Sequence, residues 1–271
     1  MKYSLDFSDT AIFIMGGSSG INLGIAEAFA AHGANVAIAS RSQDKVDAAV
    51  KILSAHGAKA IGFSADVRDV EAVKATLENA QKQFGTIDVL VSGAAGNFPA
   101  SALDMSPNAF KSVVDIDLLG TFHVLQSAYP YLTKPGASLI NISAPQALVP
   151  MELQIHVCAA KAGVDMITRG LAMEWGAAGI RVNSVVPGPI QGTEGMKRMA
   201  PTAELQEVVT NSLPLGRLGS PQDIANAVMF LASPLANFVT GAVIPVDGGF
   251  SLGGASVAGA AITHQFKQLK R

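Results

Sequence analysis

The chain has 271 residues, of which 49% are hydrophobic and only 15% are charged. Globular proteins usually carry roughly 25% charged residues, so this composition excludes a disordered chain and favours surfaces buried in an oligomer. The net charge of −2 excludes a strongly basic nucleic-acid binder. The single cysteine, Cys158, permits neither an internal disulfide nor a thiolate zinc site, and no stretch of about 20 apolar residues predicts a membrane span.

Short apolar segments alternate with helical patterns along almost the whole chain. These segments are apolar throughout, which predicts strands that are covered on both faces of a sheet. The predicted strands are Ala11–Met15, Asn35–Ala39, Ala60–Phe63, Ile87–Val91, Ser138–Ile142, Arg181–Val186 and Ala242–Val246. The alternation predicts an α/β fold: a single-domain Rossmann fold with a doubly wound, seven-stranded parallel sheet and helices on both faces.

Serine followed by proline marks two predicted helix starts, at Ser106–Pro107 and Ser220–Pro221, with the serine as the cap. Long apolar helices are expected over Ala109–Leu132 and Glu152–Ala178, and their low charge suggests faces buried between subunits.

Two regions depart from the alternation of strands and helices. Residues 187–214 are interrupted by glycine and proline, which is typical of a mobile lid over a site. The tail, about residues 250–271, is rich in Gly and Ala and then polar, and its pattern assigns it no structure.

A glycine-rich segment, GGSSGINLG over residues 16–24, follows the first predicted strand and opens a helix. Such a turn lets backbone N–H groups approach a pyrophosphate, and the N-terminus of the helix favours negative charge. The segment therefore predicts dinucleotide binding, with a flexible helix start as the alternative.

The residues that end the second and third strands indicate which dinucleotide binds. A carboxylate after the second strand would favour NAD, but the sequence there is Ser40-Arg41-Ser42. A guanidinium flanked by hydroxyls suits a 2′-phosphate, so NADP is the predicted cofactor, with Arg41 as an ordinary surface arginine the alternative. Asp66 and Val67, which end the third strand, are expected to lie against the adenine.

Over about residues 8–250 the chain resembles the short-chain dehydrogenase/reductase family. Gly16 and Gly20 match its glycine turn, and Asn22 stands in place of the third glycine. Asn tolerates a positive φ better than other non-glycine residues, so we expect Asn22 to preserve the turn through that conformation. Further landmarks are Ser92–Ala95, Arg181–Asn183, Pro187–Gly188 and Asp247–Gly249.

The family's catalytic residues are only partly present. Ser143 and Lys161 match, but the tyrosine position is Val157 and the asparagine position is Asp117. Because Val157 cannot donate a proton to a carbonyl oxygen, ordinary ketone reduction is disfavoured. His156 is its neighbour, and adjacent helix residues point ~100° apart, so we expect His156 at the helix surface or in a subunit interface.

The chain closely resembles the 2,4-dienoyl-CoA reductases of peroxisomal type within this family. The matching segments are Ala94–Phe98, Asp115–Asp117, Ala172–Gly176, Pro187–Ile190 and Gly192–Gly195. The resemblance implies NADPH-dependent reduction of a 2,4-dienoyl-CoA to a 3-enoyl-CoA. Reduction of a conjugated C=C bond needs oxyanion stabilisation and a proton delivered to carbon, which does not require a phenol beside a carbonyl oxygen.

The resemblance also implies roles for individual residues. Lys161 would hold the nicotinamide ribose and stabilise the dienolate, and Asp117 would position or protonate a water. The alternative is a structural Asp117–Lys161 ion pair, and Ser143 either binds the substrate or merely ends its strand. Expected cofactor-binding residues are Gly16, Ser18, Ser19, Gly20, Ile21, Arg41, Ser42, Asp66, Val67, Ala94, Lys161, Pro187, Gly188 and Ile190, and expected substrate-binding residues are Asn97, Phe98 and Met196.

Two other functions stay open: reduction of another activated alkene or a carbonyl, and NADPH binding without turnover. The candidates for the CoA phosphates are Lys197, Arg198, Lys267, Lys270 and Arg271. The family resemblance implies a homotetramer, and no metal, nucleic-acid or membrane partner is expected. The sequence ends Leu-Lys-Arg, unlike a Ser-Lys-Leu peroxisomal address, so a cytoplasmic location is expected.

Overall fold

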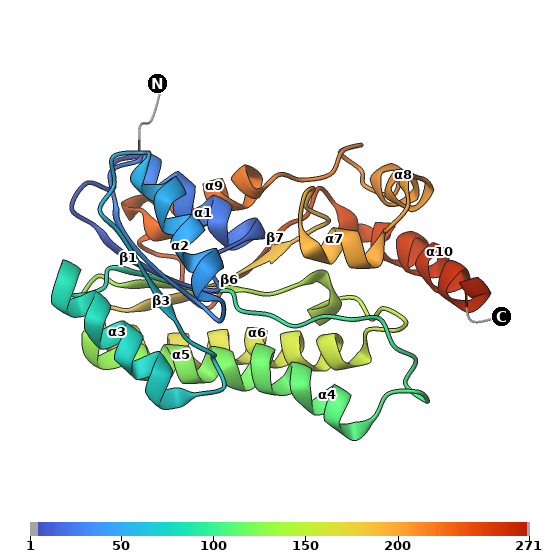
Figure 1. The fold of residues 1–271 in the computed structure, drawn as a ribbon, viewed down its shortest axis with the longest axis horizontal. Helices are drawn as coiled ribbons and strands as arrows, with labels where there is room; N and C mark the ends of the chain where they lie inside the picture. Colours follow the sequence, from blue (N-terminus) through green and yellow to red (C-terminus); the bar gives the residue numbers. More distant parts are fainter. Residues whose placement is uncertain (1–4, 270–271) are drawn as a thin grey trace.

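A parallel sheet with the strand order β3-β2-β1-β4-β5-β6-β7 forms the middle layer (Figure 1). In this computed structural model, which describes residues 5–269, every predicted strand is present with its ends within two residues of the expected positions. The strands are β1 Ala11–Met15, β2 Asn35–Ser40, β3 Ala60–Ser64, β4 Val89–Ser92, β5 Ser138–Ile142, β6 Arg181–Pro187 and β7 Val243–Val246. Strand order reverses between β1 and β4, and a sheet of this kind binds ligands in the crevice beside such a reversal.

Helices cover both faces of the sheet, which explains why the strands are apolar throughout. Ile12 and Ile14 of β1 pack on one side against α1, α2 and α9, while Phe13 and Met15 pack on the other against α3 and α5, and all four are at most 1% exposed. The covering helices are α1 Gly20–Ala31, α2 Gln43–Ser54 and α9 Pro221–Ala232 on the first face, and α3 Val70–Phe84, α5 Gly120–Ala128 and α6 Ile155–Trp175 on the second (Figure 1).

The helix predicted over Ala109–Leu132 runs without a break from Pro107 to Tyr131, but it is not α-helical throughout. It consists of α4 Pro107–Val113, a π-helical segment over Val114–Leu119, α5, and a 3₁₀ turn over Tyr129–Tyr131. The π-helical segment turns Asp117 inward, where its side chain is 1% exposed. Other 3₁₀ turns are Pro145–Ala147, Gly176–Ala178, Pro234–Ala236 and Phe250–Leu252.

Residues 187–214, which the sequence predicted to be a lid interrupted by glycine and proline, include two short helices, and the tail that the sequence left unassigned is also helical. The lid region contains α7 Glu194–Met199 and α8 Ala203–Asn211, while the tail forms α10 Gly254–Leu269. Thr193 and Thr202 cap α7 and α8 by accepting backbone N–H bonds. These three helices gather beside β7 around a small core of their own (Figure 1). No helix within residues 5–269 is long and apolar enough to cross a membrane.

Helix α9 begins at the predicted serine cap and packs directly on α1. Ser220 accepts from the Asp223 N–H, and Asp223 accepts from the Ser220 N–H, which completes a capping box. A Cβ on Gly24 of α1 would lie 2.4 Å from Pro221 Cβ, so glycine permits the close approach of the two helices. Asp223 also pairs with Arg217 at 2.9 Å.

The substitution Asp223→Asn tests this cap. The hydrogen bond from Arg217 holds the pKa of Asp223 far below its usual value, and the bond from the Ser220 backbone acts in the same direction. The stabilisation that ionised Asp223 gives the folded protein is therefore present above the pKa of the unfolded state and fades as the pH falls below about 4. We expect Asp223→Asn to lower the free energy of unfolding by roughly 1 kcal/mol at pH 7, with a smaller difference at pH 3, measured by urea denaturation. The exposed carboxylate Glu207, changed to Gln, is the control, and an equal loss at both pH values would contradict the prediction.

Candidate active site

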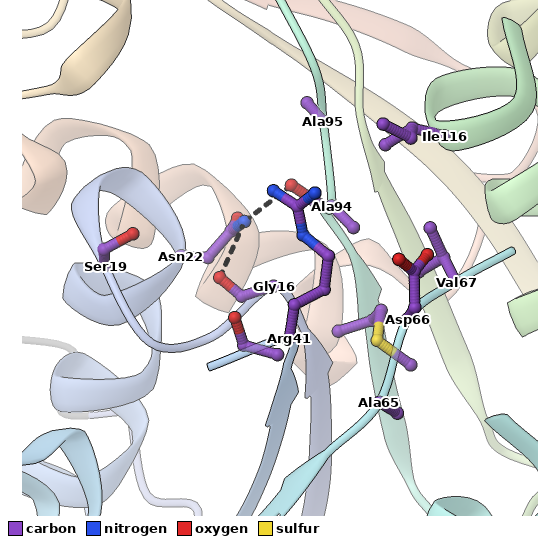
Figure 2. Close-up of a pocket in the computed structure, with 13 residues that line it drawn as sticks. Gly16, Ser19, Asn22, Arg41, Ala65, Asp66, Val67, Ala94, Ala95 and Ile116 are labelled. Atoms are coloured by element: carbon purple, nitrogen blue, oxygen red, sulfur yellow. Dashed lines mark hydrogen bonds between the residues drawn. The ribbon is translucent and has the colours of Figure 1, made fainter. Parts of the chain in front are cut away.

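A pocket opens at the carboxyl ends of β1, β2, β3 and β4, where the strand order reverses. The glycine turn forms one wall, and the residues after β3 and β4 form the opposite walls (Figure 2). The lining residues are Met15, Gly16, Ser19, Asn22, Ser40, Arg41, Ala65, Asp66, Val67, Gly93, Ala94, Ala95 and Ile116. Gly16 has φ +85°, and a Cβ there would lie 2.9 Å from Ala94 N, so only glycine fits this turn.

Asn22 preserves the turn in a way that differs from our expectation. It does not adopt a positive φ but lies within α1, where its buried amide donates to Gly93 O at 2.8 Å and to Gly16 O at 3.4 Å. A Cβ on Gly93 would lie 2.3 Å from Asn22 Oδ1. The Asn22 side chain therefore fills the space that a side chain at position 93 would occupy, and it links the turn to the end of β4.

Arg41 extends across the pocket from the end of β2, with Asn22 on one side and Asp66 and Val67 on the other (Figure 2). Within residues 5–269 its guanidinium has no carboxylate within ion-pair distance, whereas Asp66 is paired with Arg68 at 2.6 Å. The hydrogen bond from Arg68 lowers the pKa of Asp66. The pocket thus presents the exposed, unpaired guanidinium of Arg41, while the negative charge of its one carboxylate, Asp66, is balanced by Arg68.

Asp117 and Lys161 form a buried ion pair behind the pocket, 3.3 Å apart, with side chains 1% and 6% exposed. The Gly96 N–H donates to Asp117 Oδ1 at 2.7 Å, and Lys161 Nζ donates to Ile142 O at 2.9 Å. The pair expected as the structural alternative is therefore present. It joins the π-helical segment, α6, the end of β5 and the loop after β4.

Val157 lies four residues before Lys161 on α6 and is 3% exposed. It packs with Val113, Ala160, Phe98 and Leu118, an apolar cluster that holds no proton donor. Tyr129 and Tyr131, the tyrosines within the described chain, lie beyond the far end of the sheet, where Tyr131 O accepts from the Ile87 N–H just before β4. Within residues 5–269, neither tyrosine therefore lies beside Val157.

His156 is fully buried, so the expectation of a surface or interface position was wrong. Its ring packs on the Phe98 ring, and the two ring centroids are 4.5 Å apart. The start of α6 lies beneath the loop after β4, and this loop covers the face of the helix that carries His156. Burial lowers the pKa of His156, which favours a neutral ring.

Unpartnered polar atoms gather around this loop. Asn97 Oδ1, Gln154 Oε1 and both ring nitrogens of His156 are buried without a hydrogen-bond partner in the described residues, and Asp117 Oδ2 has only its ion-pair contact with Lys161. Such groups are few in native proteins, so their concentration at one place indicates room for a polar ligand or ordered water. Gln154 and His156 were not among the expected substrate residues. The sequence signal that could have indicated them is that two polar residues stand at the start of a helix predicted to be apolar.

The predicted cofactor residues fall into three groups. Those that line the pocket are Gly16, Ser19, Arg41, Asp66, Val67 and Ala94. Gly188 and Ile190 line a second pocket between β6, β7 and the segment before α9. The remaining predicted cofactor residues line neither pocket: Ser18, Gly20, Ile21, Ser42 and Pro187, which lie in the same loops and helix starts, and Lys161. The predicted substrate residues Asn97, Phe98 and Met196 also line neither pocket.

Packing alone also accounts for two of the predicted cofactor residues, Gly188 and Ile190. A Cβ on Gly188 would lie 2.6 Å from Asp247 Cα, and Ile190 is a core residue. Seven pocket residues were absent from the predicted cofactor set, and most of them adjoin predicted positions along the chain: Met15, Asn22, Ser40, Ala65, Gly93, Ala95 and Ile116.

The sheet order, the glycine turn and the crevice beside it define a dinucleotide-binding protein of the Rossmann type. Residues 16–251 match the family model described as enoyl-(acyl carrier protein) reductase. A solved short-chain dehydrogenase from Bacillus anthracis aligns with a TM-score of 0.82 at 37% identity, over 89% of this chain and 96% of that one. The chain belongs to the short-chain dehydrogenase/reductase family, and this membership together with the fold implies a nicotinamide cofactor.

Among curated proteins, the chain is similar to enzymes named peroxisomal 2,4-dienoyl-CoA reductase. The protein from Pongo abelii is 49% identical over 89% of this chain and 83% of its own length. The protein from Saccharomyces cerevisiae is 41% identical over 90% of this chain and 84% of its own length. These relatives support a reductase of the same type.

The packing of Asn22 against Gly93 yields a prediction about both positions. Gly93→Ala would force a methyl group into the buried Asn22 amide, and overpacking of this kind costs about 1–3 kcal/mol. We expect a lower thermal midpoint and weaker nicotinamide-cofactor binding, with at least half of the loss recovered in Asn22→Gly/Gly93→Ala. Gly170→Ala, at a position with nothing within 4 Å of the added Cβ, is the matched control. Equal stability of Gly93→Ala and the wild type would contradict this account.

Proposed function

We propose that the protein reduces a 2,4-dienoyl-CoA to a 3-enoyl-CoA with NADPH. The observation that carries the proposal is the replacement of the family's phenol by Val157 beside an intact Asp117–Lys161 pair. A site without a proton donor for a carbonyl oxygen suits a substrate that takes both hydrogens on carbon. The names of the curated relatives support the same substrate class.

The pocket residues fit NADPH better than NADH. Arg41 lines the pocket with an unpaired guanidinium that could bind a 2′-phosphate through two hydrogen bonds, and the hydroxyl of Ser42 follows it in the chain. The glycine turn, with Ser18, Ser19, Gly20 and Ile21, would hold the pyrophosphate at the N-terminus of α1. Asp66 and Val67 would contact the adenine, while Ala94 and the Pro187–Ile190 loop would border the nicotinamide half.

The chain's own residues would stabilise the charge that develops during this reaction. When bound, NADPH would supply a hydride to the far end of the diene, and negative charge would develop on the thioester oxygen. Lys161 and Ser143 would stabilise that oxyanion, since a fixed cation and a hydroxyl in a buried site favour developing negative charge. Asp117 Oδ1 accepts from the Gly96 N–H, and Oδ2, 3.3 Å from Lys161 Nζ, would hold Lys161 in place and also accept from the water that delivers a proton to the α-carbon.

The substrate would lie between the loop after β4 and the lid formed by residues 187–214. Arg198 of α7 donates to Asn97 O at 2.9 Å, which joins these two segments. Asn97 would contact the thioester, and Phe98 and Met196 would border the acyl chain. Lys197, Arg198 and Lys267 are exposed candidates for the CoA phosphates, whereas the other two candidates, Lys270 and Arg271, lie outside the described residues.

Exposed apolar side chains on α6 and beside α5 favour the predicted homotetramer. Met166 and Met173 are 61% and 86% exposed, and Leu119 and Phe122 are 43% and 37% exposed. Side chains of this size on the outer face of two helices suit burial against another subunit. The cytoplasmic location remains a prediction from the sequence.

A direct assay tests the proposed reaction. We expect purified protein to oxidise NADPH in the presence of 2,4-hexadienoyl-CoA, measured by absorbance, with the 3-enoyl product identified by mass spectrometry. Asp117→Ala should reduce turnover at least tenfold, because Lys161 loses its partner and the water loses its acceptor. Oxidation only with simple ketones would favour a carbonyl reductase, and cofactor binding without oxidation of any substrate would favour a non-catalytic NADPH-binding protein.

Arg41 provides a separate prediction about the cofactor. Arg41→Ala should weaken NADPH binding about tenfold to hundredfold, since charge-assisted hydrogen bonds to the 2′-phosphate are lost. NADH binding should change less than threefold, as titration of nicotinamide fluorescence would measure. Lys51→Ala, an exposed cation on α2, is the control, and equal losses for both dinucleotides would rule out this role.

A further inference from the structure

Val67 connects the pocket at the carboxyl ends of the strands to helix α5. It lines that pocket beside Asp66, just after β3 (Figure 2), and the proposed function places the adenine of the cofactor against it. The carbonyl oxygen of Val67 lies 2.9 Å from Nδ1 of His123, which belongs to α5. The proposed reaction assigns no role to His123, although this contact joins it directly to a residue of the pocket.

The contact shows which nitrogen of His123 carries a hydrogen. A carbonyl oxygen can only accept, so Nδ1 donates, and the neutral ring has the Nδ1–H tautomer. Among the hydrogen bonds of the described residues, the Val67 carbonyl accepts from His123 alone. His123 is partly buried and lines neither pocket, so any effect that it has on a bound ligand acts through Val67.

A second contact from α5 restrains the side chain of Val67. Gly120 begins this helix, and a Cβ at Gly120 would lie 2.6 Å from Val67 Cγ2 and 2.9 Å from Val67 Cβ. Glycine therefore permits the backbone of α5 to approach Val67 closely. Residues three apart lie on the same face of a helix, so Gly120 and His123 hold the side chain and the carbonyl of Val67 from one turn.

We propose that His123 is a positioning residue for the adenine of the cofactor, because its hydrogen bond fixes the Val67 backbone in the wall of the pocket. A wall that is already ordered costs a ligand less conformational freedom on binding. Without His123, the Val67 carbonyl loses its partner, and the ligand itself must order the segment between β3 and α3. The inference rests on the adenine position in the proposed function, but it depends neither on the acyl substrate nor on the choice of NADP over NAD.

Binding of fragments of the cofactor separates this role from a general structural one. We expect His123→Leu to weaken the binding of ADP, 2′,5′-ADP and NADPH by one common factor of about threefold to tenfold, since one hydrogen bond no longer orders the wall. The factor is common because the three ligands share the adenine. His123→Asn places an amide N–H near the position of Nδ1 and should restore all three affinities to within about twofold. Isothermal titration calorimetry would measure each dissociation constant.

His32→Leu is the matched control for this experiment. His32 is also partly buried, and its Nδ1 contacts a backbone carbonyl, Ala28 O, at 2.7 Å, but neither residue lines a pocket. The control should leave the three affinities within about twofold of the wild type. Unchanged ADP binding in His123→Leu, a larger loss for NADPH than for ADP, a loss that His123→Asn repeats, or an equal loss in His32→Leu would each overturn the proposal.

Nuclear magnetic resonance of the wild type with isotope-labelled histidine provides a readout that needs no folded variant. At a pH where the rings are neutral, the nitrogen shifts should identify the Nδ1–H tautomer of His123, and ADP should move its resonances more than those of His32. The Nε2–H tautomer, or an equal response of both rings, would overturn the proposal even if the dienoyl-CoA is reduced. The expected response together with no dienoyl-CoA reduction would reject the proposed substrate and uphold the role of His123.

Discussion

The buried ion pair between Asp117 and Lys161 is the interaction on which the site depends. A lysine this deeply buried needs compensation, because the loss of hydration of a buried ion costs several kcal/mol. Asp117 and the carbonyl of Ile142 provide it, and the Gly96 N–H satisfies the other oxygen of the carboxylate. One pair therefore fixes α6, the end of β5, the π-helical segment and the loop after β4. Removal of either partner would leave an uncompensated charge in the interior.

Around this pair, the described residues place no phenol. Val157 lies in an apolar cluster with Val113, Ala160, Phe98 and Leu118, and neither tyrosine of the described chain lies beside it. The polar atoms without partners lie instead on Asn97, Gln154 and His156, beside the loop that Asp117 holds.

The glycine turn shows how a departure from a motif is compensated by packing. Asn22 occupies a position where the family has glycine, and its amide takes the space above Gly93. The Asn22 side chain occupies the space that a side chain at position 93 would need, so Asn22 requires glycine at that position. The turn keeps its shape because the side-chain amide joins two backbone carbonyls.

The sequence by itself determined the architecture, because continuous apolar strands, serine caps and a glycine turn are local signals. It placed all seven strands within two residues of their ends, the starts of α4 and α9, and the wall of the pocket at Gly16, Arg41 and Asp66. It also indicated the pairing of Asp117 with Lys161 through resemblance to a family.

Only the tertiary structure decided the conformations that contacts between distant residues impose. The π-helical segment at Asp117, the burial of His156 under Phe98 and the helical role of Asn22 arise from packing between segments far apart in the chain. The same holds for α10, whose glycine- and alanine-rich sequence carries a weak local signal and folds against α8. Periodicity reports which face of a segment is apolar, but the partner that covers that face is set by the fold.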